Sequence, residues 1–120
     1  MSTDDITVGV LSLHSSKESK AILNAADEMG YDTEWLRAQN TRVEVEDGEA
    51  TLYPDVDVIA NRLLLSSDEH PAEGIGLALT LERLAPMLNE PIAATRALHK
   101  FASATALVEA GVPIPDAVLA

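Results

Sequence analysis

The feature that most constrains the fold is a nearly continuous apolar run close to the N-terminus. Residues 6–13 read ITVGVLSL and are rich in β-branched side chains. A run of this kind is typical of a strand that is buried on both faces of a parallel sheet. Parallel neighbours need a crossover, and a helical pattern followed by a second strand at residues 31–37 supplies one. Strand, helix and strand within about thirty residues predict one right-handed βαβ unit.

The crossover helix has recognisable start and stop signals. Ser15 followed by Glu18 is a capping-box pattern, so a helix is predicted to begin near Ser16. Gly30 is expected to end it, because glycine readily adopts the left-handed conformation found after helix ends. The apolar residues at helical spacing, which we expect to face the sheet, are Ala21, Ile22, Ala25, Ala26 and Met29.

The middle of the chain predicts a hairpin and then a third core strand. Residues 42–53, RVEVEDGEATLY, alternate around Asp47-Gly48, the dipeptide that a type I′ turn favours. The hairpin is expected to decorate the sheet or to lie at its edge. Residues 55–61, DVDVIAN, form the third core strand, which runs out at Asn61 and Arg62.

A second helix is predicted after a loop at residues 63–70. Pro71 suits the first turn of a helix, and Pro86 limits its far end. Residues 87–88 are a candidate for a very short strand before Asn89. The stripe expected to face the core consists of Leu77, Leu81, Leu84 and Leu88.

The last segment predicts one amphipathic helix and an extended exit. The helix is expected to start between Thr95 and Leu98 and to stop at Gly111, after which two prolines hold the chain extended. Residues 112–120 resemble the entrance to another strand. The main stripe of the helix is expected to be Ala97, Phe101, Ala104 and Val108.

Charge is the strongest compositional signal. The chain has 20 acidic and 8 basic residues, a net charge of −12, and the basic residues are scattered. This argues against nucleic-acid binding, which needs clustered lysine and arginine. An apolar fraction of 47% is too high for a disordered chain. A folded, acidic, lysine-poor protein fits adaptation to high salt, where screening suppresses self-repulsion.

The sequence also limits compartment and chemistry. It has no cysteine, no signal peptide and no apolar stretch of membrane-spanning length, so we expect a soluble cytoplasmic protein without a membrane partner. Dinucleotide and phosphate-loop motifs are absent. The histidines, His14, His70 and His99, are isolated, so no metal site is predicted, and no residue is assigned as catalytic.

Two places remain as candidate binding sites, because ligands of open α/β sheets bind at the carboxyl ends of the strands. Ser15, in the turn after the first strand, could hold an anion near the helix start, although a simple capping role is favoured. Arg62, after the third strand, could bind an anion or substrate, or could form a structural ion pair with a carboxylate. Both alternatives stay open for Arg62.

Three stretches resemble the N-terminal portion of a RimK-type ATP-grasp ligase. Residues 55–62, DVDVIANR, resemble the family's strand end, and residues 88–100, LNEPIAATRALHK, resemble the segment that ends in its Asp-Lys pair. Residues 101–115, which include LVEAGVPIP, resemble the helix and exit strand that follow.

The resemblance implies a three-layer α/β pre-ATP-grasp domain at residues 1–94, with a small parallel sheet flanked by helices and a β-hairpin insertion. Residues 95–120 would then lead into an ATP-grasp domain. The implied activity is ATP-dependent ligation of an amine and a carboxylate, commonly addition of glutamate, through an acyl phosphate. Lys100 matches the lysine expected to approach the nucleotide phosphates, and Arg62, Asn89 and Ser15 are the candidate substrate-binding residues.

Two departures from the family pattern affect this expectation. His99 stands where the family has aspartate, and the sequence ends at Ala120, before the ATP-grasp domain. ATP and Mg²⁺ are therefore expected for a complete enzyme, with a further domain or partner chain, and not for these residues alone; self-association stays open. The alternatives are a stand-alone α/β interaction or small-anion-sensing module without catalysis and, more weakly, a receiver-like fold without its phosphoacceptor.

Overall fold

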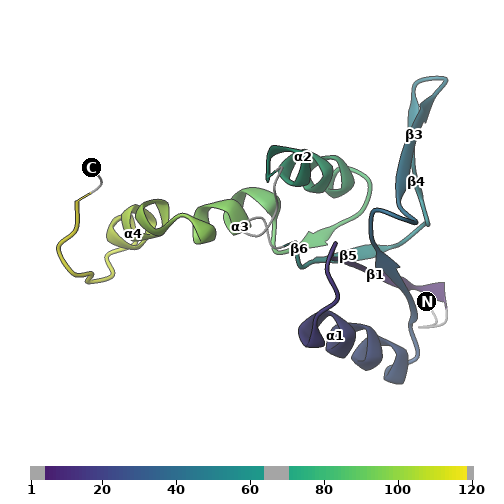
Figure 1. The fold of residues 1–120 in the computed structure, drawn as a ribbon, viewed down its shortest axis with the longest axis horizontal. Helices are drawn as coiled ribbons and strands as arrows, with labels where there is room; N and C mark the ends of the chain where they lie inside the picture. The colour runs from purple at the N-terminus through teal and green to yellow at the C-terminus, as the bar shows by residue number, and fades with distance from the viewer. Residues whose placement is uncertain (1–4, 64–70, 119–120) are drawn as a thin grey trace.

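A computed structural model describes residues 5–63 and 71–118 and has an α/β fold (Figure 1). Its main sheet is parallel, with the strand order β2-β1-β5-β6. The predicted βαβ unit, the third core strand and the short strand after Pro86 are therefore confirmed. The four strands are β1 (Thr7–Leu11), β2 (Asp32–Leu36), β5 (Val58–Asn61) and β6 (Met87–Leu88).

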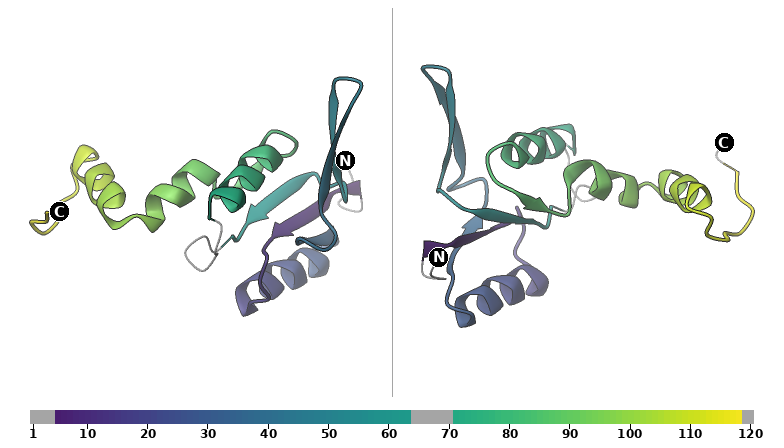
Figure 2. Two further views of the ribbon diagram at one scale, coloured as in Figure 1. Left: turned by 45° about the horizontal axis from the view of Figure 1, so that its top comes forward. Right: turned by 180° about the vertical axis from the view of Figure 1, so that it is seen from behind.

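Two helices cover opposite faces of this sheet. Helix α1 (Lys17–Glu28) makes the crossover from β1 to β2 and contacts both strands. Helix α2 (Pro71–Glu82) makes the crossover from β5 to β6, beginning at the predicted proline. Both views in Figure 2 place α1 and α2 on either side of the strands. This arrangement follows from the strand order, because β1 and β5 lead their crossovers in opposite directions along the sheet.

Helix α1 begins near Ser16 as predicted, but its cap and its packing differ from the prediction. Its N-cap is Ser16, whose hydroxyl accepts a hydrogen bond from the Ser19 backbone N–H at 3.1 Å, so the capping role predicted for Ser15 is wrong by one residue. Gly30, with φ of 91°, follows the helix end as predicted. The face toward the sheet is set by the buried Ser19 and Ala26.

The predicted buried side of α1 is therefore only partly correct. Ala26 is buried and Ile22 is half-buried, but Ala21 and Ala25 are exposed and Met29 is 66% exposed. Ser19 and Ala26 are small, which lets the helix approach the sheet closely. Burial of the serine is tolerated because its hydroxyl accepts a hydrogen bond from the Ser16 hydroxyl at 3.0 Å.

The main core lies between the sheet and α2. Leu11, Leu36, Ile59 and Leu81 are completely buried there. The side chains of Leu36 and Val56 pack closely over Gly9, where an added Cβ would lie 3.1 Å from both Leu36 Cδ1 and a Val56 methyl group. The other buried members of this core are Leu52, Val56, Ala78, Ala85 and Met87.

The leucine stripe predicted for the second helix is confirmed over most of its length. Leu81 is buried, and Leu77 and Leu84 pack against the core. Leu88 is 67% exposed, so its predicted burial is wrong. It belongs to β6, where strand alternation directs Met87 toward α2 and Leu88 toward the opposite face. The loop predicted at residues 63–70 lies outside the described residues, apart from Leu63.

The predicted hairpin is confirmed and forms a sheet of its own. Its strands are β3 (Arg42–Glu46) and β4 (Glu49–Tyr53), paired antiparallel around Asp47 and Gly48. Both turn residues have positive φ, 52° and 78°, as a type I′ turn requires. The hairpin projects from the body (Figure 1), and its charged face is exposed, as expected.

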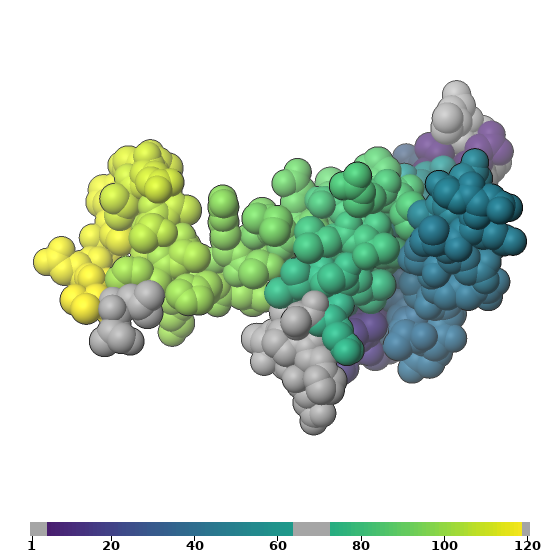
Figure 3. Space-filling view, turned by 90° about the horizontal axis from the view of Figure 1, so that it is seen from above, coloured from purple at the N-terminus to yellow at the C-terminus, as the bar shows by residue number. Residues whose placement is uncertain are grey.

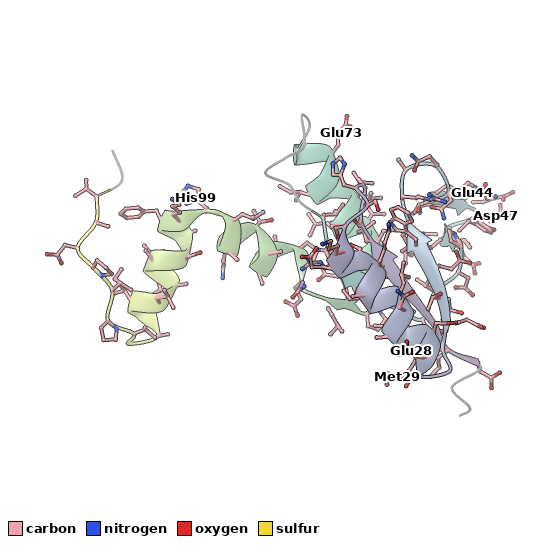
Figure 4. All side chains as sticks on the ribbon, turned by 60° about the horizontal axis from the view of Figure 1, so that its bottom comes forward. Glu28, Met29, Glu44, Asp47, Glu73 and His99 are labelled. Carbon is pink, nitrogen blue, oxygen red and sulfur yellow. The ribbon has the colours of Figure 1, made fainter. Side chains whose placement is uncertain are left out.

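The C-terminal part of the chain differs most from the prediction. Two helices, α3 (Pro91–Leu98) and α4 (Lys100–Glu109), replace the single helix expected to start between Thr95 and Leu98. The break is at His99, whose extended backbone (φ −94°, ψ 112°) ends one helix, while its imidazole Nδ1 accepts a hydrogen bond from the Ala102 N–H at 3.1 Å and caps the next. Figure 4 shows His99 at this turn.

We call residues 91–118 the arm, because it extends away from the sheet (Figure 3). Helix α4 has no buried residue, and Val108 of the predicted stripe is 56% exposed. Gly111, with φ of 80°, ends α4 as predicted. The predicted exit strand is not found among the described residues, since residues 112–118 pair with no strand. A β-strand needs a neighbouring edge, and this stretch lies at the far end of the arm, away from the sheet (Figure 1).

Candidate functional site

The candidate site lies at the carboxyl edge of the parallel sheet. Because all four strands run in the same direction, the residues that follow them gather at one edge. Arg62 follows β5 and Asn89 follows β6, and these two strands are hydrogen-bonded neighbours. The backbone N–H of Arg62 also donates to the Leu11 carbonyl of β1 at 2.9 Å, which ties this point to the centre of the sheet.

Two asparagines join the ends of β5 and β6. The Asn61 side-chain amide donates to the Asn89 carbonyl at 3.1 Å, and the Asn89 amide donates to the Asn61 carbonyl at 3.3 Å. Asn61 Oδ1 also accepts from the Leu63 N–H at 3.2 Å. Asn89 has a φ of 64°, a left-handed conformation that asparagine tolerates better than most residues. The pair thus fixes the turn from β6 into α3.

A pocket opens beside this pair. Its volume is about 350 Å³, close to the lower end of the range typical of ligand sites. It brings together Arg62 and Asn89, the two residues that the sequence singled out at separate strand ends. The other lining residues are Asn61, Leu63 and, from α3, Ala93, Ala94, Ala97 and Leu98. We call this cavity the Arg62 pocket.

The side chain of Arg62 is poorly satisfied by its surroundings. Its Nε atom is buried and has no hydrogen-bond partner among the described residues. Within the same residues the ion pair found is Arg42–Glu44, on the hairpin. A buried donor without a partner costs about 1–3 kcal/mol, and more when it is charged. The unpartnered Nε could serve a bound anion, and both alternatives for Arg62 stay open.

Lys100 lies in a different hollow. It is the exposed first residue of α4 and lines a cavity of about 430 Å³ along the arm, with Ser103, Leu107 and Pro115 among its other lining residues. Ala97 lines both this hollow and the Arg62 pocket. The two predicted sites are therefore adjacent along the arm but are separate cavities.

Ser15 is not part of the Arg62 pocket. It is exposed in the turn between β1 and α1, and the neighbouring Ser16 caps the helix. The backbone of this turn is held by Trp35, whose indole N–H donates to the Ser12 carbonyl at 2.8 Å. A role for Ser15 in substrate binding stays a prediction.

Two features of the pocket were missed from the sequence. Asn61 was recognised only as the strand end, although its polar side chain in an apolar strand was a usable signal. Ala93 and Ala94 of α3 were missed because the helix was expected to start later. Pro91, at the first helical position, was the available start signal.

The described residues contain no group of three or more histidine, aspartate or glutamate side chains arranged to hold a metal ion. In the same part of the chain, no helix is long and apolar enough to cross a membrane. No model of a known protein family matches this chain, and no curated protein is similar to it.

Proposed function

We propose that this chain is the N-terminal, pre-ATP-grasp part of an ATP-dependent carboxylate–amine ligase that adds glutamate through an acyl-phosphate intermediate. The stretches that carry the family resemblance lie beside the two cavities. Residues 55–62 end at the Arg62 pocket, and residues 88–100 run from β6 through α3 to Lys100. The observation that carries the proposal is that Arg62 and Asn89 line one pocket, while Lys100 lies in the adjoining hollow of the arm.

The exposed arm supports the second half of the proposal. Helix α4 contributes no buried residue, and its apolar side chains Leu107 and Val108 are 43% and 56% exposed. We propose that an ATP-grasp domain, in the same polypeptide or in a partner chain, covers this surface. The covering domain would bury these apolar side chains, whose exposure to water is unfavourable.

The described residues fit one contact to a nucleotide. Lys100 offers an ammonium group at a helix start, in an open hollow, and such a group can bind phosphate oxygens through charge-assisted hydrogen bonds. Bound Mg-ATP would supply the phosphoryl group that activates the carboxylate. The Mg²⁺ ligands and the remaining phosphate contacts would come from the proposed ATP-grasp domain.

The proposal is tested by the DNA that follows codon 120 and by the protein it encodes. A continuing frame, or an adjacent gene, with a glycine-rich loop and clustered acids is expected. Protein that includes both parts should add glutamate to an acceptor only when ATP is present, and the 120-residue chain alone should not. A frame that stops, with no ATP-grasp gene beside it, contradicts the proposal.

The role of Lys100 is tested in the same two-part enzyme. Lys100→Ala should raise the KM for ATP, because it removes a cation from the phosphate site. Lys20→Ala is the matched control, since Lys20 is also an exposed helix lysine but lies on α1, remote from the arm. Equal KM and kcat for the wild type and Lys100→Ala would reduce Lys100 to a surface residue.

The second candidate function is a small-anion-binding module without catalysis. It is favoured by one observation, the buried Arg62 Nε that has no partner among the described residues beside an open pocket. This function predicts anion binding by the isolated chain and no ligase activity in any longer protein. The ligase assay therefore separates the two candidates.

A further inference from the structure

We propose that the Arg62 pocket binds a small monocarboxylate with a short aliphatic body, and that it does not bind a dicarboxylate or a phosphate. The pocket combines one cation with an apolar wall. Among the described lining residues Arg62 is the only charged one, while Leu63, Ala93, Ala94, Ala97 and Leu98 are apolar. The ligand class follows from the size, the charge and the wall of the pocket.

The size of the pocket limits the ligand to a small molecule. Its volume of about 350 Å³ is near the minimum for ligand sites, and such sites bury most of the surface of the molecule they hold. A volume at the lower end of this range favours a small compound over a large one.

The charge of the pocket selects a monoanion. A guanidinium group matches a carboxylate in geometry and can bind both of its oxygens. One Arg62 balances one negative charge, and the chain around it has a net charge of −12. A phosphate or a second carboxylate would bring further negative charge that meets no second cation among the described lining residues, and burying such an unpaired charge is costly.

The two asparagines of the pocket are partly engaged with each other. The Asn61 amide donates to the Asn89 carbonyl, and its oxygen accepts from the Leu63 N–H. The Asn89 amide donates to the Asn61 carbonyl. The alanines and leucines form the rest of the described wall, so an aliphatic chain would pack there favourably, whereas oxygens of a larger oxyanion that face this wall would meet no donor.

Within the proposed ligase this pocket would receive the carboxylate end of the acceptor and not the added glutamate, which is a dicarboxylate. That role rests on the proposed function. The binding itself does not, because it depends only on the described pocket.

The test is a titration of the 120-residue chain, followed by backbone amide NMR at constant ionic strength. Butyrate is the probe, and glutarate, sulfate and the neutral butyramide are the comparisons. Butyrate should give saturable shifts at Arg62, Asn89 and Ala93 and should bind more tightly than each comparison. Shifts that do not saturate, or tighter binding of glutarate or sulfate, would overturn the proposal.

Two variants test the pocket from opposite sides. Arg62→Gln removes the cation and should weaken butyrate binding about tenfold or more, as expected for loss of a charge-assisted hydrogen bond. Ala93→Leu changes an exposed position of α3, so the variant should fold. Its larger side chain should fill part of the pocket and weaken butyrate binding by a similar factor. Arg83→Gln is the control, because it removes an exposed positive charge outside the pocket and should leave binding unchanged.

An unchanged dissociation constant in either pocket variant, or an equal loss in Arg83→Gln, would also overturn the proposal. The ligase assay is a separate readout. Butyrate binding without ligase activity in a longer protein would reject the proposed function and keep this inference, and ligase activity without butyrate binding would do the reverse.

Discussion

Asn89 offers the sharpest test of how the pocket is built, because its backbone and its side chain can be perturbed separately. Its φ of 64° is left-handed, and its side-chain amide donates to the Asn61 carbonyl at 3.3 Å. Asn89→Gly removes the hydrogen bond and tolerates the backbone conformation, whereas Asn89→Ala removes the hydrogen bond and also strains the backbone.

The magnitudes follow from these two contributions. Loss of a hydrogen bond of this kind costs about 1 kcal/mol. A left-handed conformation costs a residue with a Cβ about 1–2 kcal/mol. We therefore expect Asn89→Gly to lower the free energy of unfolding by about 1 kcal/mol or less, and Asn89→Ala by about 2–3 kcal/mol.

The measurement is equilibrium unfolding in urea. Trp35, the only tryptophan, reports on the sheet, because its indole is hydrogen-bonded to the Ser12 carbonyl. With a denaturant dependence of about 2 kcal/mol per molar urea, Asn89→Ala should move the midpoint down by about 1 M and Asn89→Gly by less than half of that. Equal midpoints for the two variants would refute the argument that the left-handed backbone contributes to the cost.

Three further predictions concern the core, the arm and the charge. Gly9→Ala should lower the free energy of unfolding by about 1–3 kcal/mol, because the added Cβ would lie 3.1 Å from side-chain atoms of Leu36 and Val56. The control Gly76→Ala has open space around it and should be neutral or stabilising. Equal urea midpoints for the two variants would contradict this prediction. His99→Ala should lower the helicity of α4, measured by ¹³Cα chemical shifts, because it removes the cap on the Ala102 N–H, and His99→Asp should retain it. Finally, the melting temperature should rise from dilute buffer to molar salt, because screening reduces the self-repulsion of a net charge of −12; a fall would reject adaptation to high salt.

The order of strands and helices in the body could be predicted from the sequence, because each element carries its own local signals. The apolar run of β1, the Asp47-Gly48 turn and Pro71 each act over a few residues. These signals depend on backbone preferences and on the spacing of apolar residues, so they can be recognised without knowledge of distant contacts. The arm was predicted less well, since its break at His99 depends on an unusual cap that no common pattern describes.

The candidate site could be predicted only in part. The rule that ligands bind at the carboxyl ends of parallel strands pointed to Arg62, and the family resemblance pointed to Asn89. Neither could show that the two residues line the same cavity, because this depends on β5 and β6 being neighbours and on α3 starting at Pro91.

The sequence by itself therefore determined the α/β class, the parallel sheet, the hairpin and the strongly acidic character of this protein. Only the tertiary structure decided which face of α1 is buried, that Leu88 is exposed, and that Asn61 and Asn89 hold a pocket around Arg62. The physical reason is the range of the interactions. Helix and turn signals act between residues a few positions apart, whereas the asparagine pair joins residues 28 positions apart that meet only when the sheet has formed.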